Sequence, residues 1–216
     1  MAISNLFKSK SKKPLPQRDV ENIKRICRLL FIDDKQFSVV GLLKRSGWVN
    51  TTSIKDVDTL DQIEIKDSHI IFVDVQGVGK KLKFSDEGLG LVIALKEKYP
   101  NKKIIVYSAE AAGPVQAFHR GIDIADARLS KLAEPYFFLN TVERFASELF
   151  SLEACVERIK KILFNEFGQN IETEDIVKKI KNIYTKNDYS VESVSKIFNL
   201  DNVGSIASIV GLFLKP

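Results

Sequence analysis

The stretch Leu29-Leu30-Phe31-Ile32-Asp33-Asp34 places two aspartates directly after a nearly continuous apolar run that begins at Ile26. Short apolar runs of this kind are typical of strands buried on both faces of a parallel sheet. A second run, His69-Ile70-Ile71-Phe72-Val73, also ends in an aspartate, Asp74. Two buried strands that each end in a carboxylate indicate a sheet with acidic residues gathered at one edge.

The surrounding sequence alternates further strand patterns with helical patterns. We expect three more strands, over residues 48–54, 103–107 and 127–130, and helices over 37–45, 89–99, 114–121 and 136–149, with 56–65 either a short helix or a loop. This alternation predicts an α/β fold, a doubly wound five-stranded parallel sheet. In such sheets functional residues lie outside the carboxyl ends of the strands.

Five polar residues follow the predicted strands at that edge: Asp33, Asp34, Asp74, Ser108 and Lys131. Crowded carboxylates repel one another, and Mg²⁺ relieves that repulsion because it prefers oxygen ligands. An aspartate can act as a nucleophile toward phosphorus, while a lysine and a hydroxyl group stabilise the transferred phosphoryl group. The plainer alternative is that aspartates simply begin the turns that follow strands.

Residues 26–149 resemble the receiver domain of bacterial two-component response regulators, which has a flavodoxin-like fold. By motif, the resemblance implies that Asp74 accepts the phosphoryl group, that Ser108 in Tyr107-Ser108-Ala109-Glu110 is the switch hydroxyl, and that Lys131 pairs with the phosphoryl group. It also implies a histidine kinase, a phosphotransfer protein or a small phosphodonor as the donor. The domain would catalyse its own phosphorylation rather than act as a turnover enzyme.

The same resemblance implies an Mg²⁺ site. Asp34 and Asp74 would bind the ion, Asp33 would support it through water, and the main-chain carbonyl of Gln76 would complete the protein ligands.

Three features depart from the family pattern. The loop over residues 76–88 is longer than usual and lacks the typical proline, and Lys131 is followed by Leu132-Ala133-Glu134 before Pro135. The fifth strand, Ala127-Arg128-Leu129-Ser130, contains no aromatic switch residue. These departures leave the kinase-docking surface and the mode of switching open.

From residue 151 the strand pattern stops and four helical segments follow, which predicts a small all-α region for output or oligomerisation, and a possible homodimer through 151–216. Residues 193–210 also fit two short helices of a helix-turn-helix. The candidate recognition helix, 204–213, has no Lys or Arg, and residues 151–216 hold nine basic and nine acidic side chains. DNA binding is therefore not the favoured output.

The net charge of +5 belongs to the N-terminus, since residues 1–25 hold seven basic side chains and two acidic ones. We expect a basic disordered tail over 1–25, a receiver-like domain over 26–150 and the helical region over 151–216. No apolar run is long enough to span a membrane or to act as a secretory signal. Cys27 and Cys155 fit reduced core residues of a cytoplasmic protein.

Two other motifs do not point to sites. Gly77-Val78-Gly79-Lys80 suggests a phosphate-binding loop, but Asp74 stands where that motif needs its first glycine and Lys81 where it needs Ser or Thr. The two histidines, His69 and His119, have no metal-ligand spacing.

Two principal hypotheses follow. One is a phosphorylation-dependent signalling protein whose output is a protein contact or a dimer. The other is a receiver-like scaffold that binds a partner without phosphorylation, and a DNA-binding response regulator remains a third reading.

Overall fold

The computed structural model describes residue 15, residues 18–109 and residues 119–214. The chain forms two compact units, Val20–Ser147 and Glu148–Pro216, the latter including residues 1–19. Each unit is considered by itself.

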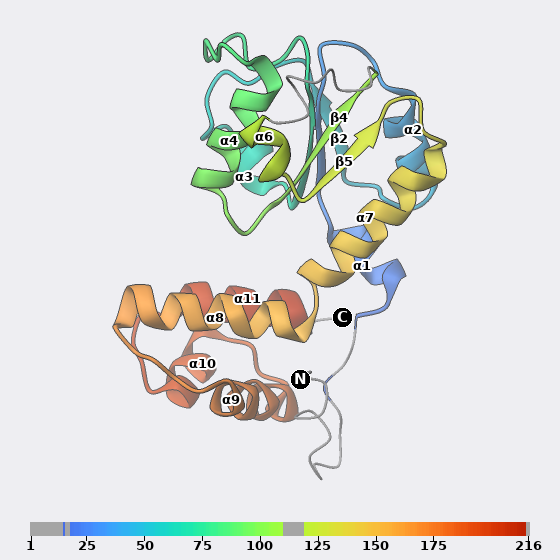
Figure 1. Ribbon diagram of the computed structural model, residues 1–216. Coiled ribbons are helices and arrows are strands. Elements are labelled where there is room, and N and C mark those ends of the chain that lie inside the picture. The colour runs from blue at the N-terminus through green and yellow to red at the C-terminus, as the bar shows by residue number, and fades with distance from the viewer. Residues whose placement is uncertain (1–14, 16–17, 110–118, 215–216) are drawn as a thin grey trace. The chain divides into compact units, whose positions relative to one another are not determined.

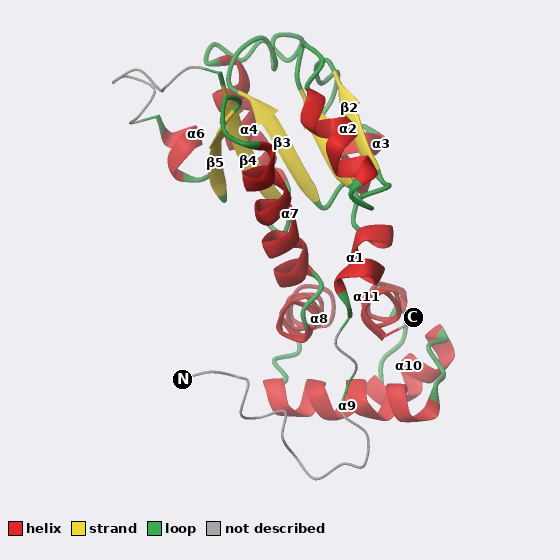
Figure 2. Cartoon of the chain, turned by 90° about the vertical axis from the view of Figure 1, so that its right-hand side faces the viewer, coloured by secondary structure: helices red, strands yellow, loops and turns green. Residues whose placement is uncertain are grey.

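The first unit is built on a five-stranded parallel sheet in the order β2-β1-β3-β4-β5 (Figures 1 and 2). Its strands are β1 (Leu29–Ile32), β2 (Thr51–Ile54), β3 (Ile70–Asp74), β4 (Lys103–Ser108) and β5 (Ala127–Ser130). All four neighbouring pairs are parallel. The predicted doubly wound α/β sheet is therefore confirmed.

Helices cover both faces of this sheet. Figure 1 shows α3, α4 and α6 on one side and α2 and α7 on the other. Their bounds are α2 (Ser38–Arg45), α3 (Ile63–Asp67), α4 (Glu87–Lys98), α6 (Arg120–Asp123) and α7 (Pro135–Leu149). The helix expected over 114–121 lies largely outside the described residues, and only its last residues fall within α6.

The central strands are buried on both faces, as their continuous apolar runs predict. On the face covered by α3 and α4, aliphatic side chains of three strands form one cluster with both helices: Leu30, Ile32, Ile65, Ile71, Val73, Leu89, Val92, Leu95, Ile104 and Val106. The opposite face is aromatic. Phe31 and Phe72 stack with ring centroids 4.2 Å apart, and Phe138 of α7 lies 6.1 Å from Phe72.

The start of this unit differs from the sequence prediction. Residues 20–26 form helix α1 (Val20–Ile26), so the expected disordered tail over 1–25 is wrong for Val20–Arg25. The first strand begins at Leu29 rather than Ile26 for the same reason. The buried Ile23 side chain gives this short segment an apolar anchor, which charge counting over 1–25 does not reveal.

The second unit is all-helical, with α8 (Leu152–Phe167), α9 (Thr173–Lys186), α10 (Val191–Phe198) and α11 (Gly204–Leu214). The pairs α8–α9, α9–α10, α10–α11 and α8–α11 pack against one another. Their apolar stripes meet in one core that includes Ile159, Ile180, Val194 and Val210. The four predicted helical segments are confirmed. Among the described residues, no helix is long and apolar enough to cross a membrane.

Gly88 lets the first turn of α4 lie against the end of β3. A Cβ atom built on Gly88 would lie 1.8 Å from the main-chain oxygen of Asp74, a separation that no packed structure tolerates. Glycine is therefore needed at this position for close approach of two backbones.

We expect Gly88→Ala to lower the free energy of unfolding by about 3 kcal/mol because α4 or β3 must shift. Urea unfolding followed by fluorescence of Trp48, the single tryptophan, measures this unit specifically because Trp48 is buried within it. Gly41→Ala is the matched control. Gly41 lies inside α2 with only the flexible end of Arg45 nearby at 3.4 Å, so alanine there should stabilise the unit by about 0.5–1 kcal/mol. Equal effects of the two substitutions would contradict the close-approach explanation.

Candidate functional site

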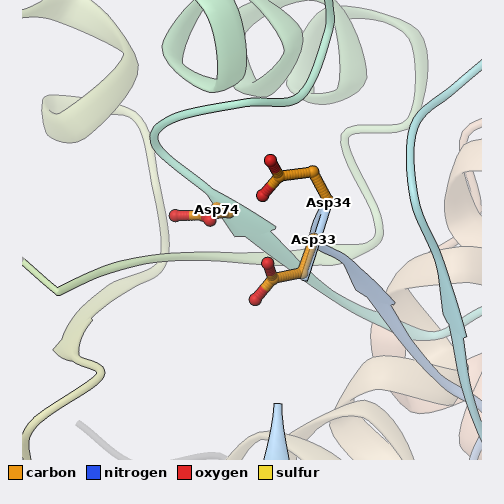
Figure 3. Close-up of side chains that lie close together, drawn as sticks. All are labelled: Asp33, Asp34 and Asp74. Atoms are coloured by element: carbon orange, nitrogen blue, oxygen red, sulfur yellow. The ribbon is translucent and has the colours of Figure 1, made fainter. Parts of the chain in front are cut away.

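Three aspartates meet at the carboxyl edge of the sheet (Figure 3). Asp33 and Asp34 follow β1 and Asp74 ends β3, and one carboxylate oxygen from each lies within 4.8 Å of the others. The register explains this meeting, since Ile32 pairs with Val73 and the next residue of each strand is an aspartate. Asp33 and Asp74 are buried, whereas Asp34 is exposed.

Lys131, directly after β5, bridges two of these carboxylates. Its Nζ lies 2.6 Å from Asp74 Oδ2 and 2.8 Å from Asp33 Oδ2. Burial of the lysine favours its neutral form, but the two carboxylates outweigh that effect and raise the pKa of Lys131. The ammonium group therefore stays charged and balances part of the negative charge of the cluster.

Asp74 is subject to opposing electrostatic effects. Burial raises the pKa of Asp74 most strongly and the neighbouring charge of Asp33 adds to that rise, whereas the hydrogen bond and charge of Lys131 oppose it. Together these effects raise the pKa of Asp74 above the usual value for aspartate. Since an ionised oxygen is the nucleophilic form, positive charge beside Asp74 favours its reactive state.

The remaining predicted residues lie at the same place. Ser108 ends β4, and its main-chain oxygen accepts a hydrogen bond from the Lys131 amide at 2.7 Å. The Gln76 amide lies 3.5 Å from Asp74 Oδ1. One cavity of about 630 Å³ is lined by Asp34, Asp74, Gln76, Ser108 and Lys131 together with ten other residues. Asp33 is not part of this lining but contacts Lys131. The structure thus brings all six predicted site residues together.

The sequence analysis missed Tyr107, the residue before Ser108. Its hydroxyl group donates a hydrogen bond of 2.9 Å to Asp33 Oδ2, and Lys131 Nζ lies 5.0 Å from the centre of its ring. Burial and then the charge of Asp33 raise the pKa of Tyr107, so the phenol remains a donor. Tyr107 pairs with Asp74 in the β3–β4 register, and this pairing, which the strand pattern alone does not give, places it at the cluster.

The loop expected over 76–88 ends earlier in the structure, because α4 begins at Glu87. The carboxylate of Asp56 holds this loop through two of its amides. Asp56 accepts hydrogen bonds from the amides of Gly79, at 2.5 Å, and Lys81, at 3.1 Å. Lys81 Nζ also pairs with Asp58 at 2.7 Å. The glycine-containing loop that resembles a phosphate-binding loop does bind an anion through its amides, but the anion is the side chain of Asp56.

Neither His119 nor the two cysteines belong to the aspartate cluster, although His119 lines the same cavity. His119 Nδ1 accepts a hydrogen bond from the Gly121 amide, and its Nε2 lies 3.3 Å from Asp86 at the rim of the cavity. Cys27 and Cys155 are buried free thiols, and burial raises the pKa of each to about 12.

The donor set fits a hard divalent cation. Three carboxylates offer oxygen ligands, and two of them, Asp34 and Asp74, line a polar cavity, which is the chemistry that Mg²⁺ selects. Their negative charge is only partly balanced by Lys131, so a bound cation would relieve a repulsion that the fold itself creates.

We expect Tyr107→Phe to lower the free energy of unfolding by about 1–3 kcal/mol, because buried Asp33 loses a hydrogen-bond donor. Denaturant titration measures the change. Tyr99→Phe is the control, since the Tyr99 hydroxyl bonds to the main-chain oxygen of Leu60 at a partly exposed position and should cost about 0.5–1 kcal/mol. An unfolding energy for Tyr107→Phe equal to that of the wild type would count against the role assigned to this hydrogen bond.

No protein-family model matches the sequence, and no curated protein matches it. Solved structures resemble its fold. NtrX from Brucella abortus in complex with ATP is 19% identical with a TM-score of 0.50, over 81% of this chain and 40% of that chain. A CheY-like response regulator receiver domain protein from Methanospirillum hungatei is 20% identical with a TM-score of 0.47, over 57% and 95%. A response regulator from Burkholderia pseudomallei, solved with a phosphorylated aspartic acid and a calcium ion, is 20% identical with a TM-score of 0.42, over 81% and 93%. The parallel sheet and the likeness to NtrX show that this chain contains a fold of the response-regulator receiver type.

Proposed function

We propose that this chain is a response-regulator-like signalling protein that accepts a phosphoryl group on Asp74 in an Mg²⁺-dependent reaction. The observation that carries the proposal is the buried Asp74 carboxylate, bonded to Lys131 and grouped with Asp33 and Asp34 on the edge of one cavity. If the aspartates only began turns after their strands, nothing would bring Lys131, which follows β5, into contact with aspartates at the ends of two other strands.

In the proposed reaction, an Asp74 carboxylate oxygen attacks phosphorus and forms an oxygen–phosphorus bond. The bond from phosphorus to the donor breaks, and its electron pair leaves with the donor. The donor is a phosphohistidine of a histidine kinase or phosphotransfer protein, or a small phosphodonor. Catalysis of such a transfer rests mainly on positioning and charge neutralisation.

The residues around Asp74 have distinct roles in this proposal. Lys131 exchanges part of its contact with Asp74 for an oxygen of the phosphoryl group, and its bond to Asp33 keeps the ammonium group in place. The Ser108 hydroxyl group donates to a second phosphoryl oxygen from the wall of the same cavity.

Asp33, Asp34, Asp74 and the carbonyl of Gln76 would hold Mg²⁺, with Asp33 acting through water. When bound, the ion supplies positive charge for the oxygens of the phosphoryl group.

The output of the phosphorylated state is proposed to be a protein–protein contact, including a homodimer through 151–216. The balanced charge of that region and the absence of Lys and Arg from α11 support this output over DNA binding.

We expect incubation with acetyl phosphate and Mg²⁺ to add one acid-labile phosphoryl group, detected by intact-protein mass spectrometry. Asp74→Asn should lose the adduct because the nucleophile is gone. Asp86→Asn should keep it, since Asp86 lines the same cavity but lies outside the cluster of three aspartates. An unmodified wild type, or an undiminished adduct in Asp74→Asn, would overturn the proposal.

We expect Asp34→Ala to weaken Mg²⁺ binding at least about tenfold, or roughly 1.4 kcal/mol, because the exposed carboxylate is a direct ligand. Isothermal titration calorimetry measures the affinity. Asp58→Ala removes an exposed carboxylate that pairs with Lys81 and should leave the affinity unchanged. Equal Mg²⁺ titrations for Asp34→Ala and the wild type would contradict the ligand assignment.

A further inference from the structure

Glu87 occupies an unusual position beside the aspartate cluster. It is the first residue of α4 and adopts a φ of +49°, a left-handed conformation that is strained for a residue other than glycine. Its carboxylate lines the cavity that contains Asp74. Such a conformation persists only where the surrounding contacts hold it.

The contacts of Glu87 join it to the loop that follows β3. Glu87 Oε2 accepts a hydrogen bond of 2.5 Å from the amide of Gly77, and Glu87 Oε1 lies 3.3 Å from Lys80 Nζ. A carboxylate that accepts from a main-chain amide forms one of the stronger hydrogen bonds in proteins. Glu87 therefore ties the beginning of α4 to the peptide group just after Gln76.

That peptide group contains the carbonyl expected to bind the cation. The amide of Gly77 and the carbonyl of Gln76 belong to the same planar unit, and the described chain contains no cis peptide bond. In a trans peptide the N–H and C=O groups point in opposite directions. By fixing the N–H group, Glu87 also fixes the direction of the Gln76 carbonyl.

Gly77 places the same peptide against a second expected ligand. Gly77 has a φ of +84°, and a Cβ atom built on it would lie 2.6 Å from Asp34 Cγ. The Asp34 carboxylate thus packs directly on the backbone of Gly77. Movement of this peptide would disturb two expected ligands, Asp34 and the carbonyl of Gln76.

We propose that Glu87 is a positioning residue of the cation site, which orients the Gln76 carbonyl and supports Asp34 through the Gly77 amide without binding the cation itself. This inference rests on the proposed function, because it assigns a support to the site that the proposal contains. Hydrogen bonds that orient ligands from outside are typically worth about 10–100-fold in metal affinity.

The rest of the loop provides a matched control. Asp56 holds the amides of Gly79 and Lys81, so it fixes the same loop by the same kind of bond. None of its hydrogen bonds reaches the peptide between Gln76 and Gly77. If cation binding needed only a rigid loop, removing either carboxylate would weaken the affinity equally. If it needs the Gln76–Gly77 peptide in one orientation, only the loss of Glu87 should weaken it.

The experiment compares Glu87→Gln, Glu87→Ala and Asp56→Ala in the full chain. A glutamine oxygen can still accept from Gly77 although the charge is lost, while alanine removes the acceptor. Calorimetric titration with Mg²⁺ should show affinity about tenfold or more weaker for Glu87→Ala. Glu87→Gln and Asp56→Ala should stay within about threefold of the wild type, a difference of roughly 0.65 kcal/mol.

A second readout needs no metal. Amide hydrogen exchange at Gly77, measured by NMR in the metal-free protein, should be about tenfold faster or more in Glu87→Ala, equivalent to roughly 1.4 kcal/mol. Exchange in Glu87→Gln and Asp56→Ala should remain close to that of the wild type. Mg²⁺ should also slow Gly77 exchange in the wild type, because coupling between two sites is reciprocal.

Wild-type Mg²⁺ affinity in Glu87→Ala would overturn the inference. Equal weakening in Glu87→Gln and Glu87→Ala would overturn it too, since it would show that charge or direct ligation matters instead of the hydrogen bond. Failure of the wild type to bind Mg²⁺ would overturn the cation site itself, and the positioning role with it. That failure is distinct from a result confined to the Glu87 variants.

Discussion

The electrostatic repulsion among Asp33, Asp34 and Asp74 is the constraint on which the rest of the site depends. Like charges at about 4 Å cost on the order of 4 kcal/mol per pair at an effective dielectric constant of about 20. Lys131 offsets part of this cost through contacts of 2.8 and 2.6 Å to Asp33 and Asp74. Tyr107 adds a buried donor to Asp33. The cluster is therefore stable in the fold but still favours added positive charge, which suits a site for a cation and a phosphoryl group.

The fold creates this crowding through register and close approach. Parallel pairing of β1 with β3 brings the aspartates to one edge, and Gly88 allows α4 to begin directly above the main chain of Asp74. The loop between β3 and α4 lines the cavity and is held by two carboxylates. Glu87 accepts a hydrogen bond from the Gly77 amide, and Asp56 accepts one from the Gly79 amide. These contacts make the loop part of the site.

Much of this architecture follows from sequence periodicity. The apolar runs before Asp33 and Asp74 predict buried strands, and parallel strands require their carboxyl ends to meet, so the fold and five of the clustered residues could be anticipated. The sixth, Gln76, came only from the resemblance to receiver domains. Tyr107 could not be assigned to Asp33 without knowing which face of β4 points toward the cluster. The hydrogen bonds of Asp56 and Glu87 could not be predicted either. Asp56 bonds to Gly79, 23 positions away, and Glu87 bonds to Gly77, 10 positions away, through loops whose sequence has no periodic pattern. Helix α1 was not predicted because residues 1–25 were interpreted from their basic charge, whereas the helix depends on the burial of Ile23.

In the proposed reaction, Asp74 accepts a phosphoryl group between Lys131, Ser108 and a divalent cation. A crystal structure grown with Mg²⁺ and beryllofluoride, a tetrahedral mimic of the phosphoryl group, tests it most directly. We expect beryllium bonded to an Asp74 carboxylate oxygen, with Lys131 Nζ and the Ser108 hydroxyl group in contact with fluorine atoms. A cavity without beryllofluoride at saturating concentration, or an adduct on another carboxylate, would contradict it.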